Sequence, residues 1–213
     1  MRHGETVGNS TLRYYGRTDV ALSESGRRQM LSAGRLLRRD YGLGPGACVF
    51  ASPLGRAVEG ARLVAGPAVW PVAVAELTEI DFGWFEGLSA GEIRARFPLE
   101  FQRWQTERSL PNYRFPGGES RRHFEARVAE GLQRMLALWQ ESRSPSKLAL
   151  LVAHRGVIRL AVRLLAGLSP QVELGSIQVL ELAGRTAALA GCAWRALALD
   201  VTGHLADVCP APS

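Results

Sequence analysis

One stretch of the sequence indicates the fold most clearly, Leu148-Ala149-Leu150-Leu151-Val152-Ala153-His154-Arg155-Gly156. Its apolar half is the most hydrophobic run in the chain and predicts a strand buried on both faces. Residues 157–165 then repeat apolar side chains at helical spacing, which predicts a helix ending at Gly167. A buried strand leading directly into a helix is typical of an α/β fold with a parallel sheet. His154 therefore stands at the carboxyl end of a strand, where open α/β sheets bind ligands.

The same strand-to-helix pattern occurs earlier in the chain. Cys48–Ala51 is a short apolar run that is followed by Ser52 and Pro53. Serine followed by proline is typical of a helix start, so we expect Ser52 to be the N-cap and Arg56 to lie on the first turn. Arg56 would then lie at the same rim as His154, although composition alone favours an exposed helix arginine.

A third strand is expected over residues 69–77, where apolar side chains alternate loosely. Two carboxylates, Glu79 and Asp81, follow it. A carboxylate there could act as a general acid or be an ordinary loop residue, and spacing does not choose between these. Because the carboxyl ends of parallel strands meet at one edge of a sheet, Glu79, Arg56 and His154 are expected to converge.

The amino terminus supplies a fourth candidate in the run Met1-Arg2-His3-Gly4-Glu5-Thr6. An arginine beside a histidine, followed by glycine, places a nucleophile and a guanidinium where the backbone can approach a ligand closely. A basic pair near an amino terminus is more often a solvated end. We expect His3 to join the rim because the other three groups already point to a site there.

The remaining elements follow from helical periodicity and turn residues. They are a helix from Ser23 to about Tyr41, helical fragments at Ala90–Phe97 and Leu99–Arg108, a long helix from Glu119 or Ser120 to Trp139, and strands at Ser176–Leu182 and Ala187–Leu199. Residues 88–118 interrupt the strand-helix rhythm, so we expect an inserted, partly helical cap that sets the leaving-group preference. We predict that residues 1–213 form one domain, a three-layer α/β/α sandwich with a mainly parallel central sheet.

Composition narrows the class of protein. Lys+Arg total 26 against 20 for Asp+Glu, and Lys147 is the only lysine, so the net charge of +6 comes from arginine, which suits phosphate recognition. No basic run with interleaved aromatics occurs, so we expect no nucleic-acid partner. The three cysteines lack metal-ligand spacing and fit a reducing cytosol. With no signal peptide or membrane-length apolar run, we expect a cytoplasmic protein without a membrane partner.

Five blocks, in this order along the chain, resemble the motifs of the histidine phosphatase superfamily. They are Arg2-His3-Gly4-Glu5-Thr6, Ser52-Pro53-Leu54-Gly55-Arg56-Ala57, Glu79 with Phe82-Gly83 and Glu86-Gly87, Pro116-Gly117-Gly118-Glu119-Ser120, and Ala153-His154-Arg155-Gly156. The similarity runs from Arg2 to roughly Leu182. It implies a phosphoglycerate mutase-like fold.

The resemblance also implies roles. His3 would be the nucleophile that becomes phosphorylated, and Glu79 would protonate the leaving oxygen and later activate water. The groups that touch or hold the phosphate would be Arg2, Asn9, Arg56 and His154. No metal ion or other cofactor is implied, because arginine supplies the positive charge that magnesium supplies elsewhere.

Within the superfamily the chain is most similar to the small phosphatases, above all the alpha-ribazole phosphatases of cobalamin synthesis. Residues 15–23 and the Pro-Gly-Gly-Glu-Ser block carry this similarity. The expected activity is hydrolysis of a small phosphorylated metabolite, either alpha-ribazole 5'-phosphate or a broad set of phosphomonoesters. A phosphoglycerate mutase-type transferase and a catalytically silent protein that binds a phosphorylated ligand remain alternatives. Apolar residues on the last strands could support a homodimer.

The chain departs from the family in one important respect. An apolar strand normally leads into the Arg-His-Gly block, but here Met1 abuts Arg2. Loss of an inner strand is expected to leave backbone groups unpaired and a slot in the core. Either the chain starts late or another segment occupies the slot.

Overall fold

The parallel sheet that the sequence predicts is confirmed in a computed structural model that describes residues 1–8, 12–142, 144, 146–183 and 193–206. Three strands lie in the order β2–β1–β3, with β1 at Cys48–Ala51, β2 at Val72–Ala73 and β3 at Ala149–Val152. Phe50 of β1 pairs with Val72 on one side and with Leu151 on the other. Short apolar runs form these strands because both of their faces are covered.

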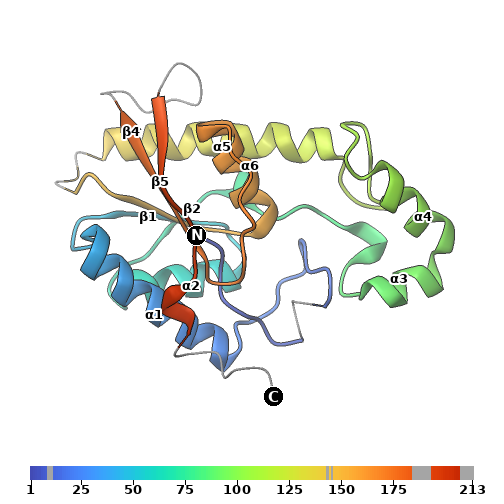
Figure 1. Ribbon diagram of the computed structural model, residues 1–213, viewed down its shortest axis with the longest axis horizontal. Coiled ribbons are helices and arrows are strands. Elements are labelled where there is room, and N and C mark those ends of the chain that lie inside the picture. The colour runs from blue at the N-terminus through green and yellow to red at the C-terminus, as the bar shows by residue number, and fades with distance from the viewer. Residues whose placement is uncertain (9–11, 143, 145, 184–192, 207–213) are drawn as a thin grey trace.

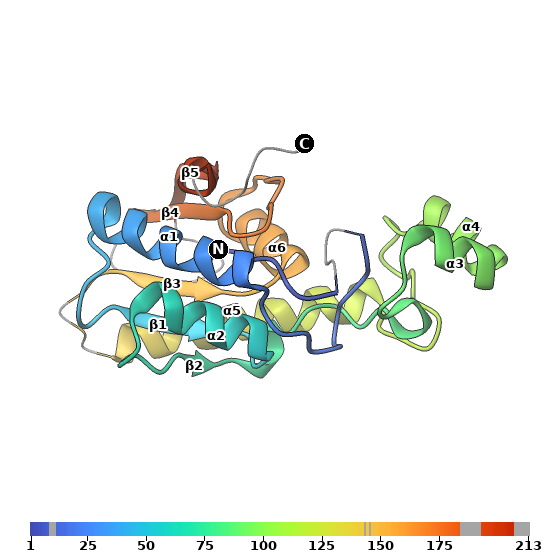
Figure 2. The ribbon, with the colours of Figure 1, turned by 90° about the horizontal axis from the view of Figure 1, so that it is seen from below.

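Helices cover both faces of the sheet (Figures 1 and 2). The four helices that do so are α1 (Glu24–Tyr41), α2 (Gly55–Ala65), α5 (Arg121–Glu141) and α6 (Arg155–Ala166). Side chains alternate between the faces of a strand, so Val49 packs in the core under α1 and α2, whereas Phe50 packs in the core under α5 and α6. The α/β/α sandwich is therefore confirmed.

Capping residues place the helix ends close to where the sequence predicts them. The Ser23 side chain accepts a hydrogen bond from the Gly26 N–H, and Gly42 ends α1 in the left-handed conformation. Ser120 caps α5 in the same way, by accepting from the His123 N–H. These caps fix the two long helices that flank the sheet.

Residues 88–118 contain the two predicted helical fragments, α3 (Ala90–Arg96) and α4 (Pro98–Glu107). They lie at one end of the molecule, away from the sheet (Figures 1 and 2). Ser89 and Glu92 form a capping box at the start of α3. A small separate core holds the region together and contains Phe85, Ile93, Trp104, Tyr113 and Phe115.

The last two strands form an antiparallel pair, β4 (Ile177–Ala183) with β5 (Ala193–Val201). The strand predicted at Ser176–Leu182 is confirmed. Of the strand predicted at Ala187–Leu199, residues 187–192 lie outside the described part, and the remainder belongs to β5. Three short 3-10 turns complete the described elements, η1 (Ala75–Leu77), η2 (Gly83–Phe85) and η3 (Gly203–Leu205).

A slot lies between β3 and β4, the strands on either side of residues 1–3. Residues 1–3 close its upper end: the Ala153 N–H donates to the Met1 carbonyl (3.1 Å), the His3 N–H donates to the Ala153 carbonyl (3.0 Å), and the Arg2 N–H donates to Ser176 (3.1 Å). Below them lies a cavity of about 180 Å³, lined mainly by apolar side chains of β3, β4, α5 and α6. Residues 1–3 thus connect the end of β3 to the segment just before β4.

Two predictions are wrong, one about where the helix after β1 begins and one about the length of the strand that follows that helix. The helix after β1 begins at Gly55 with Leu54 as N-cap, because the Ser52 hydroxyl instead bonds to the His154 ring at 2.7 Å. The strand predicted over residues 69–77 is only the two residues of β2. A 3-10 turn follows it and buries Leu77 in the core under α5 and α6.

The cavity makes a prediction about stability. Ala149 lines it, so the substitution Ala149→Val should fill part of it and raise the free energy of unfolding by about 1 kcal/mol. Ala51 of β1 is fully buried in a filled core, so Ala51→Val should instead lower the free energy of unfolding by about 1–3 kcal/mol. Urea unfolding followed by circular dichroism measures both, and a loss of stability in Ala149→Val would show that the cavity cannot accept the added methyl groups.

Candidate active site

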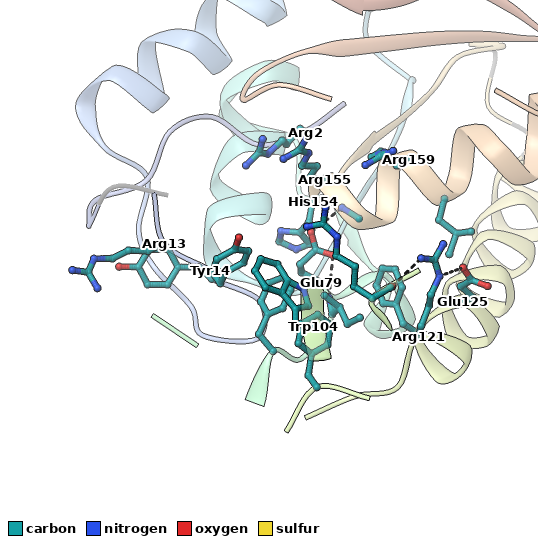
Figure 3. Close-up of a pocket in the computed structure, with 18 of the residues that line it drawn as sticks. Arg2, Arg13, Tyr14, Glu79, Trp104, Arg121, Glu125, His154, Arg155 and Arg159 are labelled. Carbon is teal, nitrogen blue, oxygen red and sulfur yellow. Dashed lines mark hydrogen bonds and ion pairs between the residues drawn. The ribbon is translucent and has the colours of Figure 1, made fainter. Parts of the chain in front are cut away.

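Four predicted site residues come together at the carboxyl ends of the parallel strands. His3, Arg56, Glu79 and His154 all line one cleft of about 680 Å³, together with the predicted Arg2. Figure 3 labels Arg2, Glu79 and His154 in this cleft. The first four are each nearly inaccessible to solvent, with exposures of 5%, 1%, 6% and 1% respectively. Four polar side chains buried together at a strand-end rim are typical of a functional site. Asn9, the further predicted phosphate contact, lies outside the described residues.

The orientation of the His3 ring identifies its free nitrogen. His3 Nδ1 lies 2.7 Å from the carbonyl oxygen of Gly4, which can only accept a hydrogen bond. Nδ1 therefore carries the proton in the neutral ring, and Nε2 keeps its lone pair. Burial lowers the pKa of His3 well below its usual value, and the nearby charges of Arg2 and Arg56 lower it further. The geometry and the electrostatics together leave a neutral imidazole with an available Nε2.

Gly4 is required for packing rather than for approach to a ligand. A Cβ on Gly4 would lie 2.4 Å from the carbonyl oxygen of Gly26, in the first turn of α1. The close contact between these two backbones locks the chain directly after His3. This reason differs from the one that the sequence suggests, because the sequence does not reveal that α1 packs there.

His154 is held beside His3 by a side chain that sequence reasoning assigned elsewhere. Its Nε2 lies 2.7 Å from the Ser52 hydroxyl, and its ring meets the His3 ring edge-on with centroids 5.2 Å apart. His154 Nδ1 is buried and has no hydrogen-bond partner among the described residues. Burial lowers the pKa of His154 well below its usual value, followed by the effects of His3 and the arginines. An unpartnered ring nitrogen remains for a ligand.

Arg56 holds a loop in place through its terminal guanidinium nitrogens and keeps its Nε free of partners among the described residues. Its guanidinium donates to the carbonyl oxygens of Thr18 and Gly16, both at 2.7 Å, and so holds the loop that follows His3. The Nε atoms of Arg56 and Arg2 are both buried, with no partner in the part of the chain that the structure describes. Burial lowers the pKa of Arg2 to about 10, which still leaves it charged at neutral pH. Two cationic N–H groups without acceptors beside His3 fit a phosphoryl group.

Glu79 faces the same space and is held in a defined position. Its Oε2 accepts a hydrogen bond from the Gly156 N–H (2.9 Å), and its Oε1 accepts one from the Ile80 N–H (3.0 Å). Burial raises the pKa of Glu79, although these hydrogen bonds and the charges of Arg2 and Arg56 act in the opposite direction. A carboxyl group with a raised pKa can carry a proton to a leaving group.

Arg127 of α5 supports Glu79 from behind, and the sequence offered no signal for this role. Its guanidinium donates to the carbonyl oxygens of Thr78 (2.6 Å) and Glu79 (3.0 Å). It also pairs with the buried carboxylate of Glu119 at 2.8 Å. In the sequence Arg127 is one polar position on an amphipathic helix. Only the packing of α5 against the turn at residues 75–79 brings it under the site.

The outer part of the cleft is aromatic and basic. Tyr14, in the loop that follows His3, lies edge-on to Trp104 of the cap with centroids 5.3 Å apart. Trp104 was not predicted in the site, because in the sequence it is an apolar position of α4. Figure 3 shows Arg155 and Arg159 on the same side of the cleft as His154, and Trp104 on another side.

None of the helices formed by the described residues is both long and apolar enough to cross a membrane. The same residues contain no group of three or more His, Cys, Asp or Glu side chains placed to hold a metal ion.

A family model described as histidine phosphatase superfamily (branch 1) matches residues 1–194. The chain belongs to this superfamily. The first curated relatives that the chain matches are 34% identical over 165 residues, and the chain spans only 42% of their length. A 2,3-bisphosphoglycerate-dependent phosphoglycerate mutase 2 of Gloeobacter violaceus is 36% identical over 187 residues, covering 84% of this chain and 80% of the mutase.

Solved structures support the same assignment. A putative alpha-ribazole-5'-P phosphatase from Escherichia coli is 25% identical, with a TM-score of 0.72 and 94% of each chain covered. A mycobacterial glucosyl-3-phosphoglycerate phosphatase is 26% identical, with a TM-score of 0.74, covering 94% of this chain and 96% of that one. The predicted family and fold are confirmed.

The support of Glu79 by Gly156 yields a prediction. A Cβ on Gly156 would lie 2.5 Å from Glu79 Oε1, so Gly156→Ala should displace the carboxyl group and lower kcat/KM for phosphate esters at least about tenfold. Gly91 of α3 is the matched control, since the Cβ that Gly91→Ala would add points into open space. Steady-state phosphate release measures both variants, and equal activity of Gly156→Ala and Gly91→Ala would contradict the role of this contact.

Proposed function

We propose that the protein is a phosphomonoesterase that works through a phosphohistidine at His3 and needs no metal ion. One observation carries the proposal: His3, with its Nε2 free, lines a cleft that also holds Glu79 and two arginines whose Nε atoms have no partner among the described residues. The cationic groups replace the charge stabilisation that a metal ion gives in other phosphoryl transfers.

In the first step Nε2 of neutral His3 attacks phosphorus in line with the leaving oxygen. The P–N bond forms as the P–O bond breaks, and Glu79 delivers its proton to the departing oxygen. Arg2, Arg56 and His154 hold the equatorial oxygens, where negative charge accumulates. The leaving group departs as a neutral alcohol.

In the second step water attacks phosphorus on the phosphohistidine. The Glu79 carboxylate accepts a proton from this water, and the P–N bond breaks so that its electron pair returns to Nε2. Inorganic phosphate leaves, and both His3 and Glu79 regain their starting states. The raised pKa of Glu79 serves both steps, because the group must give and take a proton near neutral pH.

Substrate choice follows from the relatives only as a proposal. Alpha-ribazole 5'-phosphate is the first candidate, since a structural neighbour carries that name, and a broad range of small phosphomonoesters is the second. Mutase-type transfer is the alternative that the curated relatives favour by name. A catalytically silent ligand-binding protein is the remaining alternative, and any turnover excludes it. Cytoplasmic location and a homodimer stay predictions from the sequence.

The nucleophile can be tested directly. His3→Ala should abolish release of phosphate from 4-nitrophenyl phosphate, with a loss of at least about 10³-fold, and should abolish the phosphoenzyme detected by intact-mass spectrometry after rapid quenching. Arg28→Ala is the control, because Arg28 is an exposed residue on α1 and does not line the cleft. Undiminished turnover in His3→Ala would contradict the proposal.

The acid is tested by pH dependence. Because the pKa of His3 is lowered, kcat/KM should persist at acid pH values where an ordinary histidine is charged. Because the first step needs protonated Glu79, kcat/KM should fall as the pH rises through the raised pKa of that group.

Glu79→Gln should remove this alkaline decline and lower kcat/KM about 10²-fold for an alkyl phosphate. The loss should be much smaller for 4-nitrophenyl phosphate, whose leaving group needs no proton. Profiles corrected for ionisation of the substrate provide the measurement, and an alkaline limb that survives unchanged in Glu79→Gln would assign the proton to another group.

A further inference from the structure

Two residues outside the cleft have a left-handed backbone, which residues with a Cβ rarely adopt. Val172 has a φ of 58° and Asp200 a φ of 53°, and no other non-glycine residue in the described part of the chain has a positive φ. Val172 is β-branched, and its side chain is buried in the core under α5 and α6. Backbone strain at a buried residue persists only where the surrounding contacts hold it, and such residues are often found at functional sites.

The Asp200 carboxylate holds Val172 in this conformation. Its Oδ1 accepts a hydrogen bond from the Val172 N–H (2.9 Å), and its Oδ2 accepts one from the Gln171 N–H (2.8 Å). Burial acts to raise the pKa of Asp200, but these hydrogen bonds and one from Gln178 outweigh it and lower the pKa. Asp200 is therefore an ionised acceptor at neutral pH, and it fixes two consecutive peptide groups of the loop.

A β-bulge brings Asp200 to this loop. The register of the β4–β5 pair shifts beside Gln178, which faces two residues of β5 rather than one. The Gln178 side chain holds the extra residue in place, because its Oε1 accepts from the Asp200 N–H (2.8 Å) and its Nε2 donates to Asp200 Oδ1 (3.1 Å). Bulges next to functional sites often serve to re-aim a side chain.

The Val172 carbonyl is in turn the anchor of Arg2 in the inner site. Arg2 Nη1 donates a hydrogen bond to this carbonyl at 3.2 Å, whereas Arg2 Nε is buried without a partner among the described residues. The same loop also holds the backbone of Arg2, whose N–H donates to the Ser176 carbonyl at 3.1 Å. Because the donors of a guanidinium form a rigid planar fork, anchoring one of its nitrogens sets the direction of the others.

We infer that Asp200 is a positioning residue for the transferred phosphoryl group: it fixes Val172, whose carbonyl aims the Arg2 guanidinium. The inference rests on the proposed function, in which Arg2 holds that group. After burial, the largest effects on the pKa of Arg2 come from the charges of Glu79 and Arg155, so Asp200 acts on Arg2 through the backbone rather than through its charge. Glycine at position 172 would adopt the conformation freely, but it would lack the buried side chain that ties the loop to the core.

The test removes the carboxylate and leaves the backbone conformation allowed. Asp200→Gly removes the acceptor, and glycine adopts a positive φ freely. Asp200→Asn keeps one acceptor oxygen and also tolerates this conformation. Leu197→Gly is the matched control, because it places a glycine at an exposed position of the same strand. Each protein is checked for cooperative urea unfolding, and then compared by steady-state turnover of 4-nitrophenyl phosphate and by calorimetric titration with orthovanadate.

We expect Asp200→Gly to lower kcat/KM about tenfold, mainly through kcat, because Arg2 stabilises charge that grows in the transition state. Binding of orthovanadate, which copies five-coordinate phosphorus, should weaken by a similar factor. Asp200→Asn should stay within about threefold of the wild-type protein, because the remaining oxygen still accepts from the Val172 N–H. Leu197→Gly should stay within about twofold, since a solvent-facing side chain contributes little.

A double-mutant cycle with Arg2→Gln separates positioning from stability. Once Arg2 is replaced, Asp200→Gly should change kcat/KM by less than about twofold, because the group that it positions is gone. A weakened hairpin would instead lower activity in both backgrounds. The inference would be overturned by wild-type activity in Asp200→Gly, by an equal loss in Asp200→Asn or Leu197→Gly, or by the full loss in the Arg2→Gln background.

The outcome is separable from that of the proposed function. Turnover by the wild-type protein together with unchanged turnover in Asp200→Gly would leave the phosphatase in place and remove the positioning role. Orthovanadate binding needs no turnover, so the same cycle can be measured as affinity. A loss of affinity in Asp200→Gly that disappears in the Arg2→Gln background, without turnover of any ester, would leave the positioning role in place and remove the phosphatase. Neither turnover nor orthovanadate binding in the wild-type protein would overturn both.

Discussion

The site depends on the hydrogen bonds that tie residues 1–3 to Leu151 and Ala153 on one side and to Gly175 and Ser176 on the other. The bonds on either side of Ala153 place His3 directly beside the end of β3, where His154 begins the next element. Gly4 then allows α1 to pack against the chain within one residue of His3.

Burial of charge is the second constraint. Two histidines, two arginines and one glutamate share a cleft floor with little solvent, which keeps the imidazoles neutral and moves the Glu79 pKa toward neutrality. Elements away from the cleft stabilise this arrangement. Arg56 is anchored by the loop at residues 15–18, and Arg127 holds the backbone under Glu79. Within the described part of the chain, the Nε atoms of Arg2 and Arg56 and the Nδ1 atom of His154 have no partner, and they mark where an anion would complete the network.

The outer cleft combines residues of unlike origin. Tyr14 comes from the loop after His3, Trp104 from the cap and Arg155 with Arg159 from the start of α6. The inner site thus uses residues at the ends of strands, whereas the outer cleft uses elements that can vary without disturbing the sheet. In the proposed phosphomonoesterase, this division would separate the chemistry at phosphorus from recognition of the leaving group.

The sequence by itself determined the family, the strand-helix alternation and the candidates His3, Arg56, Glu79 and His154, because strand-end positions and motif order are local properties of the chain. It did not determine why Gly4 is needed, that Ser52 serves His154 rather than a helix end, or that Arg127 lies beneath Glu79. These depend on contacts between segments distant in sequence, for which composition and periodicity carry no signal. Tertiary structure decided them, because hydrogen bonds and buried charges depend on distances that only packing sets.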